Sequence, residues 1–376
     1  MVTHVKHKRV EFTELFYDLV FVYAISKTTG IIHHLHHGIL STNAVVTFLI
    51  CLIVLVNTWI IQSEYTNRYG KNSLFNIVIM VIDMGLLLLL SNVFNSDWQA
   101  YFYPFSWALG TLSLTLLIQY IVQYFSKDSD QNDKEVIKLL LYVLSVRTIT
   151  VYLGTLFPYS IGIWICLTGI FTSFLMPLFA HKKLALVPLN FPHLVERVSL
   201  LVIITFGEMI LGVADYFNLE KLSLNSVFYF LICVLMFLYY FGEFDHAIDE
   251  NKNTSGIILI YSHYLIFAGI IMTTVSLSFL SDYKADPYFV VIFLYIGIFL
   301  FQQAIHLNGI IYNKPEYHYS KSYLLAQLML FFVAFGVSLL LVTNSDWILY
   351  ITTTMLLISE VIFLNFQYLR AKDKQI

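Results

Sequence analysis

The sequence predicts an all-α polytopic membrane protein with about twelve transmembrane helices. Three observations lead to this fold class: 59% of the 376 residues are hydrophobic, only 12% are charged, and the mean hydropathy is +0.75. Soluble domains contain about 45–50% apolar and about 25% charged residues. So few charges cannot cover a water-facing surface, and so much apolar surface excludes disorder. The net charge of −3 offers no basic surface for nucleic acid.

Twelve mainly apolar segments are long enough to cross a bilayer, which takes about 20 residues. In order along the chain they are 12–32, 43–62, 75–95, 101–124, 136–156, 159–180, 191–213, 224–242, 256–280, 287–308, 321–342 and 347–369. Short polar stretches separate them. The runs are continuous and lack the period-two alternation of barrel strands, so each is expected to be a helix. Glu14 and Asp18 interrupt the first run, which we interpret as a retained helix and not a signal peptide.

Lysine and arginine residues predict the orientation, because they accumulate on the cytoplasmic side of membrane proteins. Of the 21 Lys and Arg residues, sixteen fall on the side of the N-terminus when all twelve segments cross, Lys6 and Lys374 among them. Three fall on the opposite side and two lie inside spans. We therefore expect both termini to be cytoplasmic.

An internal repeat relates the two halves of the chain. The tetrapeptide Phe-Leu-Ile-Cys occurs at 48–51 and again at 230–233, an offset of 182 residues. We predict two six-helix halves, residues 1–188 and 189–376, in the same orientation and related by an axis along the membrane normal. Several transporters are built this way, with the substrate site near the midplane between the halves.

Ionisable residues inside the predicted spans are the candidate functional residues, since a charge at the bilayer centre costs at least about 2.5–3.5 kcal/mol. The candidates for coupling or substrate binding are Glu14, Asp18, Asp83, Arg147, His193, Glu196, Arg197, Glu208 and His263. Glu14 aligns with Glu196 at the offset of 182, and Asp83 aligns with His263 at an offset of 180.

A structural role is the alternative for each candidate. Charges near helix ends are tolerated because long side chains reach the headgroups, and a buried arginine can hold helices together. We interpret His306 and Glu360, which have no evident partner in the sequence, as structural residues.

Helical spacing indicates which candidates can cooperate. Glu14 and Asp18 belong to an acidic stripe on the first two turns of the first span. Arg197 and Glu208 are eleven residues apart, about 16 Å along a helix, so each needs a partner on another helix. We expect Arg147 of the fifth span to pair with an acid of the first.

Three motifs give the chain a family resemblance. Residues Glu14–Val22 resemble the E-L-F-[FY]-D-L-V-F-V opening of the bacterial low temperature requirement protein A family. His193–Arg197 resembles its H-x-x-E-R element, and Ile203–Glu208 resembles its I-I-x-x-G-E element. The resemblance implies a multi-pass protein of the bacterial cytoplasmic membrane and a site on the first and seventh spans. It implies no substrate.

Three further features have simple interpretations. His33–His37 contains four histidines, but a flexible loop lacks a fixed metal geometry, so a solvated loop is favoured over a metal site. His193-x-x-Glu196 lacks the second histidine of a metallopeptidase helix, and Arg197 in its place would repel a metal. The acidic stretch 243–250 is expected to be a solvated loop. No metal and no cofactor are expected.

Three function classes remain open. The first is a proton- or cation-coupled secondary transporter, in which buried carboxyl groups load and release protons. The second is a membrane enzyme or lipid-handling protein that uses His193 or Glu196 as a general base near the cytoplasmic headgroups. The third is a non-transporting sensor or assembly subunit, and an ion channel is a further alternative.

Transport is the function that the sequence favours, and an enzyme is less favoured. The chain has no G-x-x-x-x-G-K-[ST] loop, so an ion gradient or a partner chain would have to drive it. The expected partners are the lipid bilayer, protons or a small ion, and a small molecule of unknown identity. The sequence makes no prediction of oligomeric state.

Overall fold

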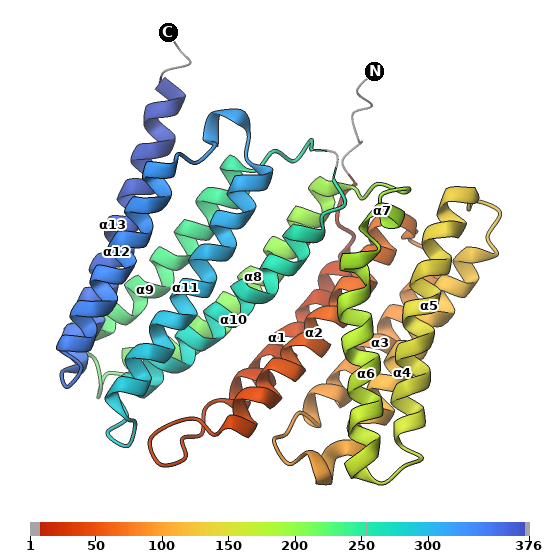
Figure 1. Ribbon diagram of the computed structural model, residues 1–376, viewed down its shortest axis with the longest axis horizontal. Coiled ribbons are helices and arrows are strands. Elements are labelled where there is room, and N and C mark those ends of the chain that lie inside the picture. The colour runs from red at the N-terminus through yellow and green to blue at the C-terminus, as the bar shows by residue number, and fades with distance from the viewer. Residues whose placement is uncertain (1–7, 253, 373–376) are drawn as a thin grey trace. The chain divides into compact units, whose positions relative to one another are not determined.

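The computed structural model describes residues 8–252 and 254–372 (Figure 1). Helices account for most of these residues, and the described part of the chain contains no strand longer than an isolated bridge. The long helices are α1 Phe12–Ile31, α2 Thr42–Tyr69, α3 Leu74–Asn92, α4 Trp98–Tyr124, α5 Gln131–Gly154, α6 Tyr159–Phe179, α8 Phe191–Ala214, α9 Leu224–Phe241, α10 Ile257–Leu280, α11 Pro287–Tyr312, α12 Lys321–Leu340 and α13 Ser345–Lys372. The short ones are α7 His181–Leu184, η1 Asp215–Phe217, the π-helix η2 Gly242–Ala247, and η3 Pro315–Tyr317. The all-α polytopic fold class is confirmed.

Eleven of the described helices are long and apolar enough to cross a membrane. The remaining predicted span, 12–32, corresponds to α1, which has the length of a span at 20 residues. It carries Glu14, Asp18 and Lys27, however, and these charges keep it below the apolarity of the other eleven. The first span is therefore the exceptional one, because its polar residues need partners within the protein.

Side-chain caps set where several helices begin. Asp130 accepts a hydrogen bond from the backbone N–H of Asp133 at 2.7 Å, and the Asp133 carboxylate accepts one from the Asp130 N–H at 3.0 Å. This capping box satisfies two of the free N–H groups at the start of α5. Asp286 caps α11 with a single hydrogen bond, accepting from the backbone N–H of Phe289 at 2.8 Å, and Pro287 is at the first helical position.

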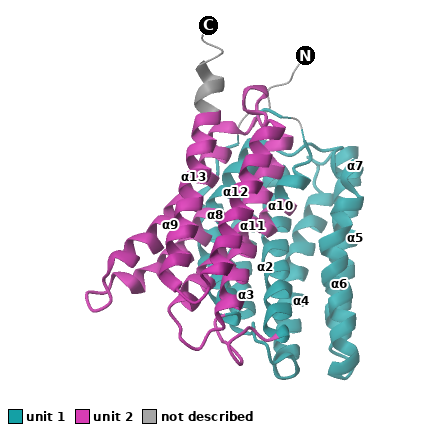
Figure 2. Ribbon diagram, turned by 60° about the vertical axis from the view of Figure 1, so that its left-hand side comes forward, with its two compact units in different colours: residues 1–32, 42–201, 251–260 teal, residues 33–41, 202–250, 261–376 magenta. Residues whose placement is uncertain are grey.

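The chain divides into two compact units (Figure 2). Unit 1 comprises residues 1–32, 42–201 and 251–260, and unit 2 comprises 33–41, 202–250 and 261–376. Within unit 1, α1 packs on α2 and α3, α4 packs on α3 and α5, and α5 packs on α6. Within unit 2, α13 packs on α9 and α12. This division follows packing, and the predicted repeat of two six-helix halves stays a prediction.

One end of unit 1 collects the connections that the sequence assigns to the cytoplasm. Lys71, between α2 and α3, forms an ion pair with Asp128, between α4 and α5. Lys183 of α7 lies 3.2 Å from the carboxylate of Glu135 near the start of α5. Which side of the membrane this end faces stays a prediction, and Lys6 and Lys374 lie outside the described residues.

Two glycines allow α5 and α6 to approach closely. A Cβ atom on Gly162 would lie 2.3 Å from the carbonyl oxygen of Gly154. Small residues at such crossings are typical of membrane helix pairs. We expect Gly162→Val to lower the free energy of unfolding by about 1–3 kcal/mol, because the clash is with backbone and the helices must separate. Thermal unfolding in detergent measures this, with Gly85→Ala as the control, since a Cβ on Gly85 meets nothing within 4 Å.

Candidate functional site

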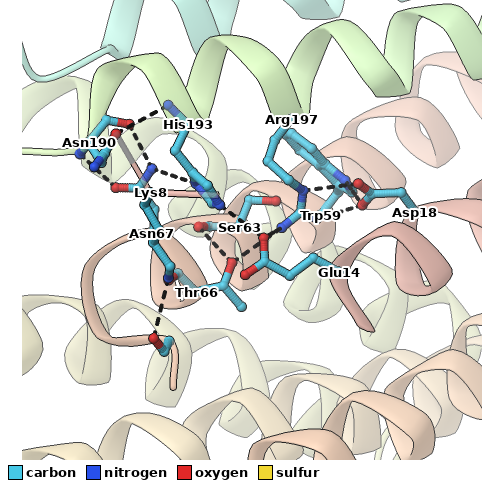
Figure 3. Close-up of polar contacts among 11 residues, drawn as sticks. Lys8, Glu14, Asp18, Trp59, Ser63, Thr66, Asn67, Asn190, His193 and Arg197 are labelled. Atoms are coloured by element: carbon cyan, nitrogen blue, oxygen red, sulfur yellow. Dashed lines mark hydrogen bonds and ion pairs between the residues drawn. The ribbon is translucent and has the colours of Figure 1, made fainter. Parts of the chain in front are cut away.

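A buried cluster of polar side chains lies between α1, α2 and the first turns of α8, all within unit 1 (Figure 3). We call it the Arg197 cluster. Its members are Glu14, Asp18, Trp59, Thr66, Asn67, Asn190, His193 and Arg197. The side chains that carry its ionisable groups are almost completely enclosed, with exposed fractions of 3% for Glu14, 1% for Asp18 and 0% for Arg197.

Helical spacing explains how the cluster assembles. Glu14 and Asp18 are four residues apart on α1, and His193 and Arg197 are four residues apart on α8. Residues at this spacing lie on one face of a helix, one turn apart. Two such faces meet, so that each basic or imidazole group lies beside a carboxylate.

Arg197 and Asp18 form a two-pronged ion pair. Arg197 donates from Nε to Asp18 Oδ2 at 2.9 Å and from Nη2 to Asp18 Oδ1 at 2.6 Å. The Trp59 indole N–H also donates to Oδ1 at 2.7 Å, and the Trp59 ring lies under the guanidinium with 5.5 Å between Cζ and the ring centroid. The parallel fork of hydrogen bonds is the strongest geometry for an arginine–carboxylate pair. Both oxygens of Asp18 are therefore committed.

Glu14 is held at only one of its two oxygens. Its Oε2 accepts from Arg197 Nη1 at 2.9 Å and contacts His193 Nε2 at 3.0 Å. Its Oε1 has no hydrogen bond in the described structure, and Glu14 lines a pocket of about 40 Å³ together with Lys8 and Thr66. Glu14 and Asp18 thus differ in their surroundings, because Glu14 borders a pocket with room for a water molecule or a small ion and Asp18 does not.

The amide of Asn67 fixes the tautomer of His193. Asn67 Oδ1 accepts from the backbone N–H of Asn190 at 2.8 Å, so Asn67 Nδ2 must be the atom that faces His193 Nδ1 at 3.1 Å. Nδ1 therefore accepts a hydrogen bond, and the neutral imidazole carries its proton on Nε2. That proton is donated to Glu14. Glu14 Oε2 then receives two donors, which stabilise its charged form.

Lys8 lies at the mouth of the same pocket. Its ammonium group donates to the backbone carbonyls of Thr66 and Gly70. Burial lowers the pKa of Lys8, while the nearby Glu14 carboxylate acts in the opposite direction. Lys8 thus adds a positive group to a cluster that contains two carboxylates and one arginine.

The structure corrects the expected role of Arg147. The ion pairs with α1 are made by Arg197, whereas Arg147 of α5 donates to Asn57 Oδ1 and Thr58 Oγ1 of α2, each at 2.8 Å. Asn57 Oδ1 also accepts from Ser173 of α6 at 3.1 Å. Arg147 consequently links α5 to α2 and α6 through neutral groups.

Asp83 of α3 is a second buried acid in unit 1. It is fully enclosed, and its Oδ1 accepts a hydrogen bond from Thr115 of α4. Its Oδ2 has no hydrogen-bond partner in the described structure. The hydroxyl of Tyr17 is close enough to interact electrostatically with Asp83. It too is buried and has no hydrogen-bond partner among the described residues.

We expect Asp83→Asn to stabilise the protein. The amide keeps an oxygen for Thr115 and cannot ionise, so the variant removes a buried acid that has no ion pair among the described residues and whose charged form is costly to bury. Thermal unfolding of both proteins in the same detergent would measure the gain. A lower unfolding temperature for Asp83→Asn would show that the carboxyl group has a stabilising partner.

The other candidates lie elsewhere. Glu196 is exposed on the surface of unit 1, although the repeat aligns it with the buried Glu14. Glu208 is half-buried in unit 2. His263, also in unit 2, is buried, with its Nε2 3.1 Å from the hydroxyl of Tyr240. The Arg197 cluster therefore unites four of the nine predicted candidates: Glu14, Asp18, His193 and Arg197.

Sequence reasoning missed the neutral members of the cluster. Trp59 and Asn67 are eight residues apart on α2, and with Thr66 they form a buried polar face on a helix that looks uniformly apolar at its start. A search for polar residues at helical spacing inside the second span would have found this face. No group of three or more His, Cys, Asp or Glu side chains with the arrangement of a metal site occurs among the described residues.

The acidic stretch 243–250 differs from its prediction at one position. Glu243 is completely buried in unit 2 and is not solvated. It lies in the π-helix η2, which continues α9 and turns the carboxylate inward. Asp245 and Glu250 are exposed, as expected for a solvated segment.

Comparison with protein families identifies the family to which the chain belongs. The model of the bacterial low temperature requirement A protein (LtrA) matches residues 9–361. The chain belongs to the LtrA family. The match includes every member of the Arg197 cluster, so the resemblance carried by the motifs at Glu14–Val22 and His193–Arg197 is confirmed.

An uncharacterized protein of Rhizobium meliloti (strain 1021) is similar to this LtrA chain. The two are 25% identical over 289 residues, which cover 72% of this chain and 69% of the relative. No solved structure matches. Family membership and the helices together describe a multi-pass membrane protein.

Proposed function

We propose that this LtrA-family protein is a secondary transporter of the bacterial cytoplasmic membrane, coupled to protons or a small cation, with Glu14 as the group that binds and releases the coupling ion. The transported solute is a small molecule. The observation that carries the proposal is a difference between two neighbouring acids. Both oxygens of Asp18 accept hydrogen bonds from Arg197 or Trp59, while Glu14 lines a pocket.

The size of that pocket supports an ion and not an organic substrate. A site for a small organic ligand has a volume of about 300–1,000 Å³, whereas the pocket at Glu14 encloses about 40 Å³. One water molecule needs about 10–15 Å³ of such space. The pocket thus has room for a few water molecules or a small cation beside the carboxylate.

The chemistry of the cluster supports reversible binding. Arg197 and His193 donate to Glu14 Oε2 and stabilise the carboxylate, while Oε1 remains free to take a proton or to contact a cation. Burial in a medium of low polarity opposes the charged form. These opposing effects are what a coupling group needs in order to exist in both states.

An enzymatic role has less support. His193 donates from Nε2 to Glu14 and accepts at Nδ1 from Asn67, so neither nitrogen is available to a substrate in this arrangement. Glu196, the other proposed base, is exposed and lies outside the cluster.

Proteoliposomes test the proposal. Vesicles with an acidic interior and a fluorescent pH indicator are diluted into buffers that contain sodium, potassium or lithium chloride, or mixtures of amino acids, sugars or organic acids. We expect one of these additions to change internal pH in vesicles that contain the protein and not in empty vesicles. A cation-coupled carrier that moves no proton is detected in parallel, as uptake of radiolabelled solute that depends on a sodium, potassium or lithium gradient. The proposal is contradicted if no addition changes the pH signal and no cation gradient drives uptake, while the reconstituted protein remains folded and correctly inserted.

A further inference from the structure

Unit 2 contains its own buried network of protonatable side chains, separate from the Arg197 cluster. Its members come from α9, η2, α11, α12, α13 and the segment before α12. They are Tyr239, Glu243, His306, Asn313, Tyr319, Tyr323, Gln327 and Ser359. The sequence indicated none of them as functional residues.

Hydrogen bonds link α9, α11, α12 and α13 in this network. Gln327 accepts from the Ser359 hydroxyl at 2.7 Å and donates to the Ser359 carbonyl at 3.1 Å, which fixes its amide, and it donates to Tyr323 Oη at 3.2 Å. The hydroxyl oxygens of Tyr323 and Tyr239 are 3.0 Å apart, and Tyr239 Oη lies 2.6 Å from His306 Nε2.

His306 is a buried member of this network. Its Nε2 contacts the Tyr239 hydroxyl, and its Nδ1 has no hydrogen-bond partner in the described structure. A buried network of this kind can contain a group that binds and releases a proton.

Glu243 is such a group. Its side chain is fully buried, its Oε2 accepts from the Tyr319 hydroxyl at 2.5 Å, and no cation forms an ion pair with it among the described residues. Burial raises the pKa of Tyr319, so this hydroxyl keeps its proton and remains a donor. Glu243 Oε1 has no hydrogen-bond partner among the residues that the structure describes.

Asn313 supplies the partner that a protonated Glu243 requires. The two side chains are within hydrogen-bonding reach of each other. Asn313 Nδ2 donates to the Tyr317 carbonyl at 3.1 Å. Asn313 Oδ1 is buried and accepts no hydrogen bond from the described residues. A single proton on Glu243 Oε1 would satisfy both partnerless oxygens, because the O–H group can donate to Asn313 Oδ1.

Gly309 of α11 leaves room for the side chains of Glu243 and Tyr319 beside this helix. A Cβ on Gly309 would lie 2.3 Å from Glu243 Oε1 and 2.3 Å from Cε2 of Tyr319, so both side chains occupy the space that a larger residue would fill. His306 lies three residues earlier, one turn away on the same face of α11. Its ring also meets the Tyr319 ring edge-on, with 5.7 Å between the centroids.

We propose that Glu243 is a second proton-binding site, in which Asn313 accepts the proton-bearing hydroxyl and in which Tyr319 donates to the carboxylate after the proton leaves. The π-helix around Glu243 fits this role, since π-helical turns occur frequently at functional sites. The nearby charged groups at the surface are satisfied separately: Asp245 pairs with His246 at 2.9 Å, and Lys314 donates to the His246 carbonyl. The proposal does not depend on Glu14.

Infrared difference spectroscopy tests this site with the proton itself as the probe. The intact protein in lipid is stepped between acidic and alkaline pH, and the carbonyl band of protonated carboxylic acids is recorded. We expect a band that disappears reversibly as the pH rises and that is missing in Glu243→Gln. Tyr319→Phe should keep the band but move its midpoint to higher pH, because the carboxylate loses a donor.

Glu360→Gln is the matched control, because Glu360 is another buried acid of unit 2 with a partnerless oxygen. It should leave the Glu243 band in place. An identical carbonyl region in wild type and Glu243→Gln would overturn the proposal, as would a Glu243 band that stays constant at every pH at which the protein is folded. Glu14→Gln should not change the Glu243 band, which separates this result from the fate of the transport proposal.

Discussion

Replacing Arg197 with glutamine is expected to lower the free energy of unfolding by about 3–5 kcal/mol. Arg197 is the only residue that forms ion pairs with both Glu14 and Asp18 among the described residues, and all three are buried. Its removal leaves the buried Asp18 carboxylate without an ion-pair partner among the described residues and leaves Lys8 as the cation near Glu14. The loss should be read as a fall in the thermal unfolding temperature in detergent.

Two further variants separate charge from geometry. Arg197→Lys keeps the charge but cannot make the two parallel hydrogen bonds to Asp18, so we expect an intermediate loss. The double variant Asp18→Asn with Arg197→Gln should recover part of the stability, since a matched neutral pair removes the unpaired charge. If Arg197→Gln alone unfolds at the wild-type temperature, the ion pairs do not stabilise this unit.

Much of the fold was predictable because a long apolar run in a membrane forms a helix. A run of about 20 apolar residues must satisfy its own backbone, and only a helix does so locally. The first segment was predicted as a span like the others, yet its acids set it apart. The same acids marked the site, because a carboxyl group inside an apolar run needs a partner and Glu14 and Asp18 share a helical face.

The partner of those acids could not be predicted from spacing. Arg147 and Arg197 both lie inside spans, and helical periodicity gives the face of each residue but not which helices pack together. Packing places α8 and not α5 where its arginine meets α1. The polar face of α2 was equally hidden, since Trp59 and Asn67 become recognisable as a site only when Asp18 and His193 face them.

Glu243 illustrates a second limit. An acidic segment after a span normally turns toward water, and Asp245, His246 and Glu250 do so. The π-helical turn adds a residue to the turn and rotates this one carboxyl group inward. Such a local change of period has no clear signature in composition.

Glu14→Gln is expected to abolish ion-coupled flux in proteoliposomes while leaving the protein folded. The glutamine oxygen can still accept from Arg197 and His193, and the Asp18–Arg197 pair remains intact and electrically balanced. What the variant loses is the ability to take up and release a proton or to attract a cation from the pocket. The measurement is the change in internal pH that the wild-type protein gives with its effective solute.

Variants of Glu220 and Asp18 serve as controls for this prediction. Glu220→Gln removes a carboxylate from an exposed position of unit 2 and should keep wild-type flux. Asp18→Asn should lower both flux and thermal stability, because it breaks the two-pronged pair with Arg197. Only Glu14→Gln is expected to separate the two measurements, with flux lost and stability kept. Wild-type flux in this variant would mean that Glu14, despite its pocket, is a structural partner of Arg197 like Asp18.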